Sequence, residues 1–241
     1  MTIHIKSEHS RAKAGSRTQL GLMIEVTAPV TPESETPIKR TDKGVVFCID
    51  RSGSMAGGRL DLVKQTILDI LPRLAPTDFI SVVTFDQAAT VVAPMGQVQK
   101  HTVSHLRELV SAIITGGNTN IELGYKTALA QAAEAPELME THVILLSDGE
   151  ANQGATDPLV LGQLAANAIE HMVSTSTLGI GEGYSEQLLD ALSVSGNGNH
   201  FAAIRIEEAV AGLNGEIEGL LERTIEGLRL DIYYGQSFRA G

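Results

Sequence analysis

Two runs of mainly apolar residues, each followed directly by an aspartate, constrain the fold of this 241-residue chain. Residues 45–49 precede Asp50, and residues 142–147 precede Asp148. Continuous runs of this length are typical of strands that are covered on both faces of a parallel sheet. In such sheets the ligand site lies outside the carboxyl ends of the strands. We therefore expect the two carboxylates to lie at one edge of a sheet.

The rest of the chain alternates between the helical and the strand pattern. Further strands are predicted at 79–85, 173–180 and 200–203, with a short segment at 90–92 that suits an edge hairpin. Apolar residues at helical spacing predict helices at 59–74, 101–114, 121–133, 158–171, 185–193 and 207–223. This alternation predicts an α/β protein with a doubly wound, mostly parallel, Rossmann-like central sheet and helices on both faces.

The two ends of the chain carry a different pattern. Residues 19–28 and 228–234 alternate between apolar and polar positions, as half-buried strands do. We expect these two strands to pair as a small β appendage, although one of them could instead extend an edge of the main sheet. The predicted organisation is an N-terminal extension with one strand and a linker (1–43), a main domain (44–226) and a C-terminal strand (227–241).

Composition limits the class of protein. The net charge of −11 argues against a nucleic-acid partner, because phosphate binding needs a basic face. The single cysteine, Cys48, excludes an internal disulfide and is expected to be a small buried hydrophobe. No apolar run approaches the length of a membrane span, and the N-terminus lacks the apolar stretch of a signal peptide. A cytoplasmic location is predicted, although a chain trimmed of its export signal would look the same.

The loop after the first buried run has the chemistry of a cation site. Asp50, Ser52 and Ser54 are alternate residues and can turn toward one point if the loop curls, which Gly53 permits. Carboxylate and hydroxyl oxygens suit Mg²⁺, with Mn²⁺ or Ca²⁺ as substitutes. Serine hydroxyls are neutral, so a cation held there keeps positive charge and has room for an external acidic group.

With two distant residues this loop completes a known pattern. Thr119 lies in the sequence Gly-Gly-Asn-Thr-Asn, and Asp148 lies in Leu-Leu-Ser-Asp-Gly. Asp-x-Ser-x-Ser followed by a distant Thr and a distant Asp resembles the metal-ion-dependent adhesion site of the von Willebrand factor A domain family. The resemblance covers residues from about 44 to about 224, and residues 145–157 and 176–181 are similar to the bacterial soluble branch.

The resemblance implies roles for these residues. Ser52, Ser54 and Thr119 would touch the metal directly, whereas Asp50 and Asp148 would act mainly through water or as hydrogen-bond acceptors around it. One departure is Asn118, which stands between the glycine pair and Thr119, where many relatives have glycine directly before the threonine.

Residues beside the motif are predicted to form a rim that contacts a partner. Two alternatives stay open. Met55 could simply pack against the first helix, and Arg51 and Glu150 could simply be exposed. His101 and His105 lie one helical turn apart and could bind zinc, but a solvated helix face is the simpler interpretation. The predicted rim residues are Arg51, Met55, Asn118, Asn120 and Glu150.

The leading hypothesis for function is a non-catalytic, metal-dependent protein-binding module. Mg²⁺ would complete its shell with an Asp or Glu from a protein partner, or from a second copy of the chain. The main alternative is a Mg²⁺-dependent hydrolase or phosphotransfer enzyme. It has little support, because the chain contains no phosphate-binding loop motif and no nucleophile-elbow motif. A third alternative is a structural subunit whose metal site is vestigial.

Overall fold

A computed structural model describes residues 2–7, 22–27, 41–148, 151–181, 183–203 and 206–221. The chain divides into two compact units, one of residues 41–221 and one of residues 1–40 with 222–241. Within the described ranges, no helix combines the length and the apolar character needed to cross a membrane. The larger unit carries the predicted site.

The larger unit is built on a six-stranded sheet among the described residues, in the order β5-β4-β3-β6-β7-β8. Only β5 runs antiparallel to its neighbour, β4, and the other pairs are parallel. The doubly wound, mostly parallel sheet predicted from the sequence is confirmed. The strands are β3 (Gly44–Asp50), β4 (Phe79–Phe85), β5 (Ala89–Gln97), β6 (Thr141–Ser147), β7 (Val173–Ile180) and β8 (His200–Ala203).

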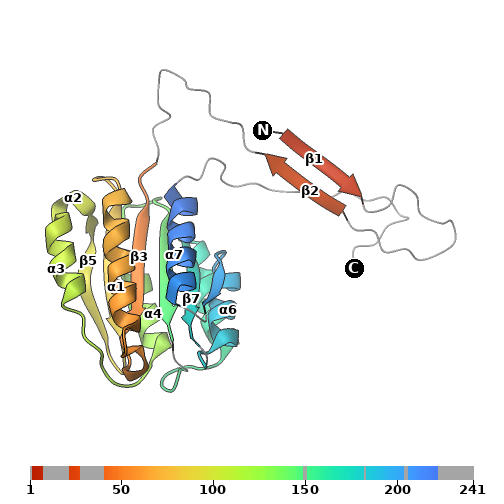
Figure 1. Ribbon diagram of the computed structural model, residues 1–241. Helices are drawn as coiled ribbons and strands as arrows, with labels where there is room; N and C mark the ends of the chain where they lie inside the picture. The colour runs from red at the N-terminus through yellow and green to blue at the C-terminus, as the bar shows by residue number, and fades with distance from the viewer. Residues whose placement is uncertain are drawn as a thin grey trace. The chain divides into compact units, whose positions relative to one another are not determined.

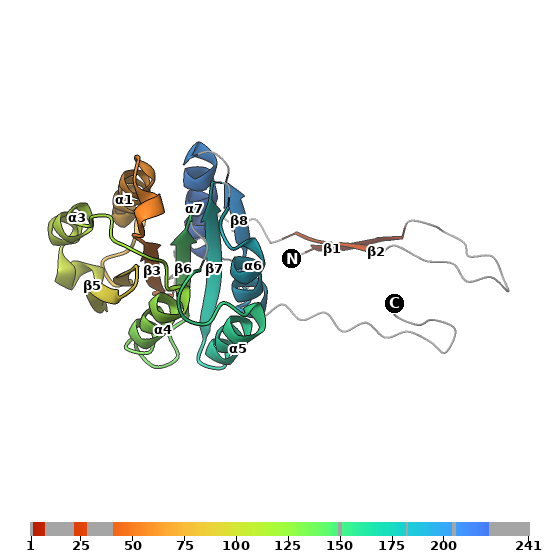
Figure 2. The same cartoon turned by 90° about the horizontal axis from the view of Figure 1, so that it is seen from below.

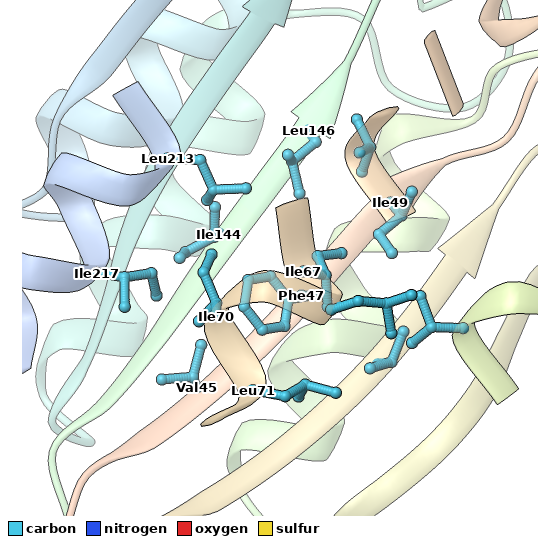
Figure 3. Close-up of a cluster of buried hydrophobic side chains, with 14 of the residues drawn as sticks. Val45, Phe47, Ile49, Ile67, Ile70, Leu71, Ile144, Leu146, Leu213 and Ile217 are labelled. Carbon is cyan, nitrogen blue, oxygen red and sulfur yellow. The ribbon is translucent and has the colours of Figure 1, made fainter. Parts of the chain in front are cut away.

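One face of the sheet packs against α1 (Arg59–Ile70), α3 (Val103–Ser111) and α7 (Ile206–Leu221). Figure 3 shows the centre of this cluster, where Phe47 of β3 lies among Ile67 and Ile70 of α1. Leu213 and Ile217 of α7 close the same cluster. Alternate residues of each strand face this side, as the period of two along a strand requires.

The other face packs against α4 (Ile121–Ala132), α5 (Pro158–Ile169) and α6 (Glu186–Ser195). Figures 1 and 2 show the sheet between the two helical layers. Cys48 belongs to this second cluster and is fully buried, as predicted. Burial raises the pKa of its thiol, so it packs as a small hydrophobe.

Three segments differ from the sequence prediction in detail. The helix expected at 101–114 is present as the shorter α3, and His101 instead ends a separate helix, α2 (Val98–His101). Thr102, at φ 55, separates the two. The segment expected at 90–92 is part of the nine-residue strand β5, which pairs with β4 through an irregular register. The helix expected to reach residue 74 ends at Ile70, and a 3₁₀ turn, η2 (Leu71–Arg73), continues it.

The smaller unit contributes a two-stranded antiparallel sheet. β1 (Thr2–Ser7) pairs with β2 (Leu22–Thr27), with Ile3 opposite Val26 and Ile5 opposite Ile24. The strand predicted at 19–28 is therefore present as β2, and β1 is a partner that the sequence analysis did not identify. The strand predicted at 228–234 lies outside the described residues, so the proposed pairing of the chain ends and the domain boundaries stay predictions.

A buried polar network fixes α7 to the sheet. Glu216 of α7 contacts His142 Nε2 of β6 at 2.9 Å, accepts a hydrogen bond from Ser176 Oγ of β7 and accepts another from Asn199 Nδ2 at 2.9 Å. The side chains of His142 and Glu216 are 4% and 10% exposed. Burial alone would raise the pKa of Glu216, but hydrogen bonds from His142, Ser176 and Asn199 lower it to about 2.

At Gly124, α4 lies so close to Phe85 of β4 that no side chain fits between them. An added methyl group would lie 2.8 Å from Phe85 Cβ and closer still to its ring. Gly124→Ala is therefore expected to lower the free energy of unfolding by about 1–3 kcal/mol through overpacking. Urea unfolding of wild type and variant measures this change in the free energy of unfolding.

Gly215 of α7 is the matched control for Gly124. It is exposed, and a methyl group there would meet nothing within 4 Å. Gly215→Ala should leave the stability unchanged or raise it by up to about 1 kcal/mol through helix propensity. Equal effects at the two positions would contradict the packing described for α4.

Candidate metal centre

Three loops meet at the carboxyl edge of the sheet, at the point where its strand order reverses. The chain passes from β3 to β4 on one side of β3, and it later enters β6 on the other side. Ligands in doubly wound sheets bind at such a switch point. Asp50 is the last residue of β3, and Asp148 directly follows β6. In Figure 1 this edge is the lower end of β3, beside the start of α1.

Asp50 is fully buried and anchors the first loop. Its Oδ1 accepts a hydrogen bond from the Ser52 backbone N–H at 2.7 Å, and its Oδ2 accepts one from Ser147 Oγ at 2.5 Å. Burial raises the pKa of Asp50, and the hydrogen bonds from Ser147 and Ser52 oppose that rise. The carboxylate thus fixes the turn that presents the two serines.

Ser52, Ser54 and Asp148 form a continuous chain of oxygen atoms. Ser52 Oγ lies 3.0 Å from Ser54 Oγ, and Ser54 Oγ donates to Asp148 Oδ1 at 2.7 Å. Neighbouring ligands of an octahedral Mg²⁺ ion are separated by about 2.9 Å, because each lies about 2.0–2.1 Å from the metal at right angles. The spacing of the two serine oxygens fits one edge of such an octahedron, and Asp148 accepts a hydrogen bond from Ser54 beside it. Hydroxyl and carboxylate oxygens form a donor set that a hard cation prefers.

The loop that carries Thr119 is joined to both of the others. Gly116 N–H donates to the Arg51 carbonyl at 2.6 Å, and Gly53 N–H donates to the Gly117 carbonyl at 2.9 Å. Thr119 N–H donates to Asn152 Oδ1 at 3.0 Å, and its carbonyl accepts from the Asn152 N–H at 3.1 Å. Thr119 is buried and held between the serine loop and the loop that follows β6.

Arg59 is the counter-ion of Asp148. Its Nη1 lies 2.6 Å from Asp148 Oδ2 and 3.3 Å from the Ser54 carbonyl. The Asp148 side chain is fully buried, whereas the Arg59 side chain is 37% exposed. A buried carboxylate is costly without a compensating partner. In this structure the guanidinium provides that compensation.

The predicted rim is only partly formed. Met55 is fully buried in the core cluster beneath α1, so its prediction as a rim residue is wrong and the packing alternative holds. Arg51 is turned to Asp86, with 2.8 Å between Nη2 and Oδ2. Asn118 is exposed, and Asn120 is half-buried and caps α4 by accepting from the Leu123 N–H. Glu150 lies outside the described residues.

The sequence pattern does not identify three further residues of the site, Arg59, Ser147 and Asn152. Ser147 directly precedes Asp148 on a predicted strand, so the pairing of β3 with β6 would have placed it beside Asp50. Arg59 opens the predicted helix after the serine loop, but a charged residue at that place gives no signal of its partner. Asn152 follows Asp148 by four residues in a polar loop, where many side chains look alike.

The zinc alternative at His101 and His105 depended on one continuous helix. The break at Thr102 places His101 in α2 and His105 in α3, so the two are no longer neighbours on one helical face. Across the residues whose placement is described, no group of three His, Cys, Asp or Glu side chains is arranged to hold a metal ion. The hydroxyl-based site at the sheet edge is of a different chemistry from such groups.

Known sequences similar to this chain include one family model and several curated proteins. The sequence matches the von Willebrand factor type A domain over residues 44–215. It is 31% identical over 188 residues to an uncharacterised protein of Synechocystis sp., covering 77% of this chain and 43% of that protein. It is 28% identical over 193 residues to inter-alpha-trypsin inhibitor heavy chain H3 of Homo sapiens, covering 77% of this chain and 21% of the human protein. This chain thus corresponds to less than half the length of either relative.

Solved structures share the fold. A von Willebrand factor type A protein from Catenulispora acidiphila superposes with a TM-score of 0.70 at 19% identity, covering 89% of this chain and 49% of that one. Proximal thread matrix protein 1 from the mussel byssus, solved with a zinc-occupied metal-ion-dependent adhesion site motif, gives a TM-score of 0.64 at 19% identity. That match covers 76% of this chain and 46% of the mussel protein. The matched sequence, the doubly wound sheet and the three loops at its carboxyl edge show that this chain belongs to the von Willebrand factor type A domain family.

Proposed function

We propose that this protein is a metal-dependent protein-binding module that holds Mg²⁺ among Asp50, Ser52, Ser54, Thr119 and Asp148. Domains of this family commonly act as metal-dependent interaction modules. The observation that carries the proposal is the chain of oxygens from Ser52 through Ser54 to Asp148, spaced at 3.0 and 2.7 Å. That the domain acts by binding rather than by catalysis is part of the proposal.

An external acidic group is the natural remaining ligand. The direct protein donors proposed for the cation are hydroxyls, which carry no charge, so they neutralise none of its positive charge. Mg²⁺ seeks about six oxygen ligands and readily keeps water where the protein leaves a position open. An Asp or Glu from a partner would replace such a water and would be the only charged group in direct contact with the metal. Ser54 is exposed, so this part of the serine loop is accessible to a partner.

The partner is proposed to be a protein, or a second copy of this chain, that presents one acidic side chain. A displayed peptide library selected on the immobilised domain in Mg²⁺, and eluted with EDTA, should enrich peptides that contain Asp or Glu. Replacing that acid by Asn or Gln in an enriched peptide should remove binding. Enriched peptides that bind equally well in EDTA, or after the acid is replaced, would contradict the proposal.

A further inference from the structure

Arg59 occupies an unusual place for a cation. It is the first residue of α1, and the N-terminus of a helix carries the positive end of the helix dipole, where positive charge is unfavourable. The turn into α1 passes through Gly57 and Gly58 at φ 78 and 99, a conformation that favours glycine. The chain thus brings a guanidinium to Asp148 despite an unfavourable helix position.

The guanidinium is enclosed from a second side. A methyl group added to Gly181, which follows β7 at φ 83, would lie 3.2 Å from Arg59 Nη2. Nη1 is engaged by Asp148 Oδ2 and the Ser54 carbonyl. Arg59 is therefore seated between Gly181, at the end of β7, and Asp148, at the end of β6. Its side chain nevertheless keeps 37% of its surface exposed beside the proposed metal position.

The charges at the site do not balance when Arg59 is included. Asp50 and Asp148 carry two negative charges, and they would neutralise a divalent cation on their own. Arg51 and Asp86 form an ion pair with each other and cancel. Arg59 adds one positive charge within hydrogen-bond distance of Asp148. With the metal bound, these side chains and the ion together carry one net positive charge, which one carboxylate would neutralise.

We propose that Arg59 is a specificity-determining residue that makes the metal site depend on an anionic ligand. Its charge disfavours the metal alone and favours the metal together with a carboxylate. The inference rests on the proposed function and adds that selection for an acid is set by a residue outside the five-residue motif. Metal and carboxylate should consequently bind cooperatively, and each should raise the affinity of the other by the same factor.

Isothermal titration of Mn²⁺ into the metal-free protein tests this, in chloride buffer and in acetate buffer of equal ionic strength. Wild type should bind Mn²⁺ more tightly in acetate than in chloride. Arg59→Gln should bind Mn²⁺ about ten-fold more tightly than wild type in chloride, as expected for removing a like charge that is partly exposed and therefore screened by solvent. The increase in Mn²⁺ affinity from chloride to acetate should be smaller for Arg59→Gln than for wild type.

Arg59→Lys is the matched control, because it retains the charge and loses only the guanidinium shape. It should follow wild type in both buffers. Equal or weaker Mn²⁺ binding by Arg59→Gln in chloride, or an undiminished gain from acetate, would overturn the inference while leaving the proposed metal site intact. Absence of Mn²⁺ binding in wild type and both variants, each folded by circular dichroism, would instead overturn the proposed function and the inference with it.

Discussion

Asp148→Asn is expected to weaken Mg²⁺ and Mn²⁺ binding by about 100-fold or more. Loss of a carboxylate that orients metal ligands costs about 10–100-fold in affinity, and here the loss also leaves the Arg59 charge unopposed. Asparagine keeps the shape of aspartate and can still accept the hydrogen bond from Ser54. The domain should therefore stay folded. Titration calorimetry with Mn²⁺ measures the affinity, and circular dichroism verifies the fold.

Asp157→Asn provides the control for this substitution. Asp157 caps α5 by accepting a hydrogen bond from the Leu159 N–H at 2.9 Å, and asparagine caps helices about as well as aspartate. The control removes one carboxylate from the same connection between β6 and α5, but one that belongs to no ligand set. Mn²⁺ affinity of Asp148→Asn within about three-fold of that of Asp157→Asn would contradict the assigned role of Asp148.

Glu216→Gln is expected to lower the free energy of unfolding by about 2–3 kcal/mol at pH 7. The pKa of Glu216 is about 2 in the folded protein, against an ordinary value of 4.5. Each pKa unit corresponds to 1.36 kcal/mol, and the expected loss is set below the value of about 3.4 kcal/mol that the two pKa values imply, because the network reaches solvent at the exposed Asn199. Urea unfolding of wild type and variant across pH measures the difference.

The pH dependence of Glu216 has a definite sign. Because its pKa is lower in the folded state, the unfolded state binds the proton more tightly. The stabilisation is fully present above about pH 4.5 and is lost as the pH falls through about 2. The difference between wild type and Glu216→Gln should shrink over this range.

Glu218 on the same helix is the control for Glu216. Glu218 is 56% exposed and pairs with Arg73, which is 43% exposed. Glu218→Gln should change stability by less than about 1 kcal/mol at any pH, because exposed ion pairs contribute little. A Glu216→Gln effect no larger than that of Glu218→Gln would show that the buried network does not hold α7 to the sheet.

The elements of the sheet could be predicted because their signals are local. The apolar runs 45–49 and 142–147 are typical of strands covered on both faces, and the structure places them as adjacent parallel strands β3 and β6. The helices followed from apolar spacing in the same way. The break at Thr102 gives little signal in the sequence, because no glycine or proline marks it. In the structure Thr102 caps α3 by accepting a hydrogen bond from the His105 N–H.

The motif residues of the site could be predicted from the sequence, but the side chains that surround them could not. Asp50 and Asp148 follow strand patterns, so topology alone brings them to one edge. Arg59 and Glu216 are different, because a charged residue on a helix is usually solvated, and only the three-dimensional arrangement shows which buried group it faces. The prediction of Met55 as a rim residue is wrong for a related reason. The sequence shows its closeness to the motif but not that η1 (Gly53–Met55) turns its side chain inward.

The proposed site consists of oxygens from three separate loops that hold one divalent cation at the carboxyl edge of the sheet. A crystal of the protein grown with Mn²⁺ and measured for anomalous scattering tests it directly. One anomalous peak is expected within coordination distance of the hydroxyls of Ser52, Ser54 and Thr119, with Asp50 and Asp148 around it. No peak among these five residues at saturating Mn²⁺, or a peak held by other side chains, would contradict it.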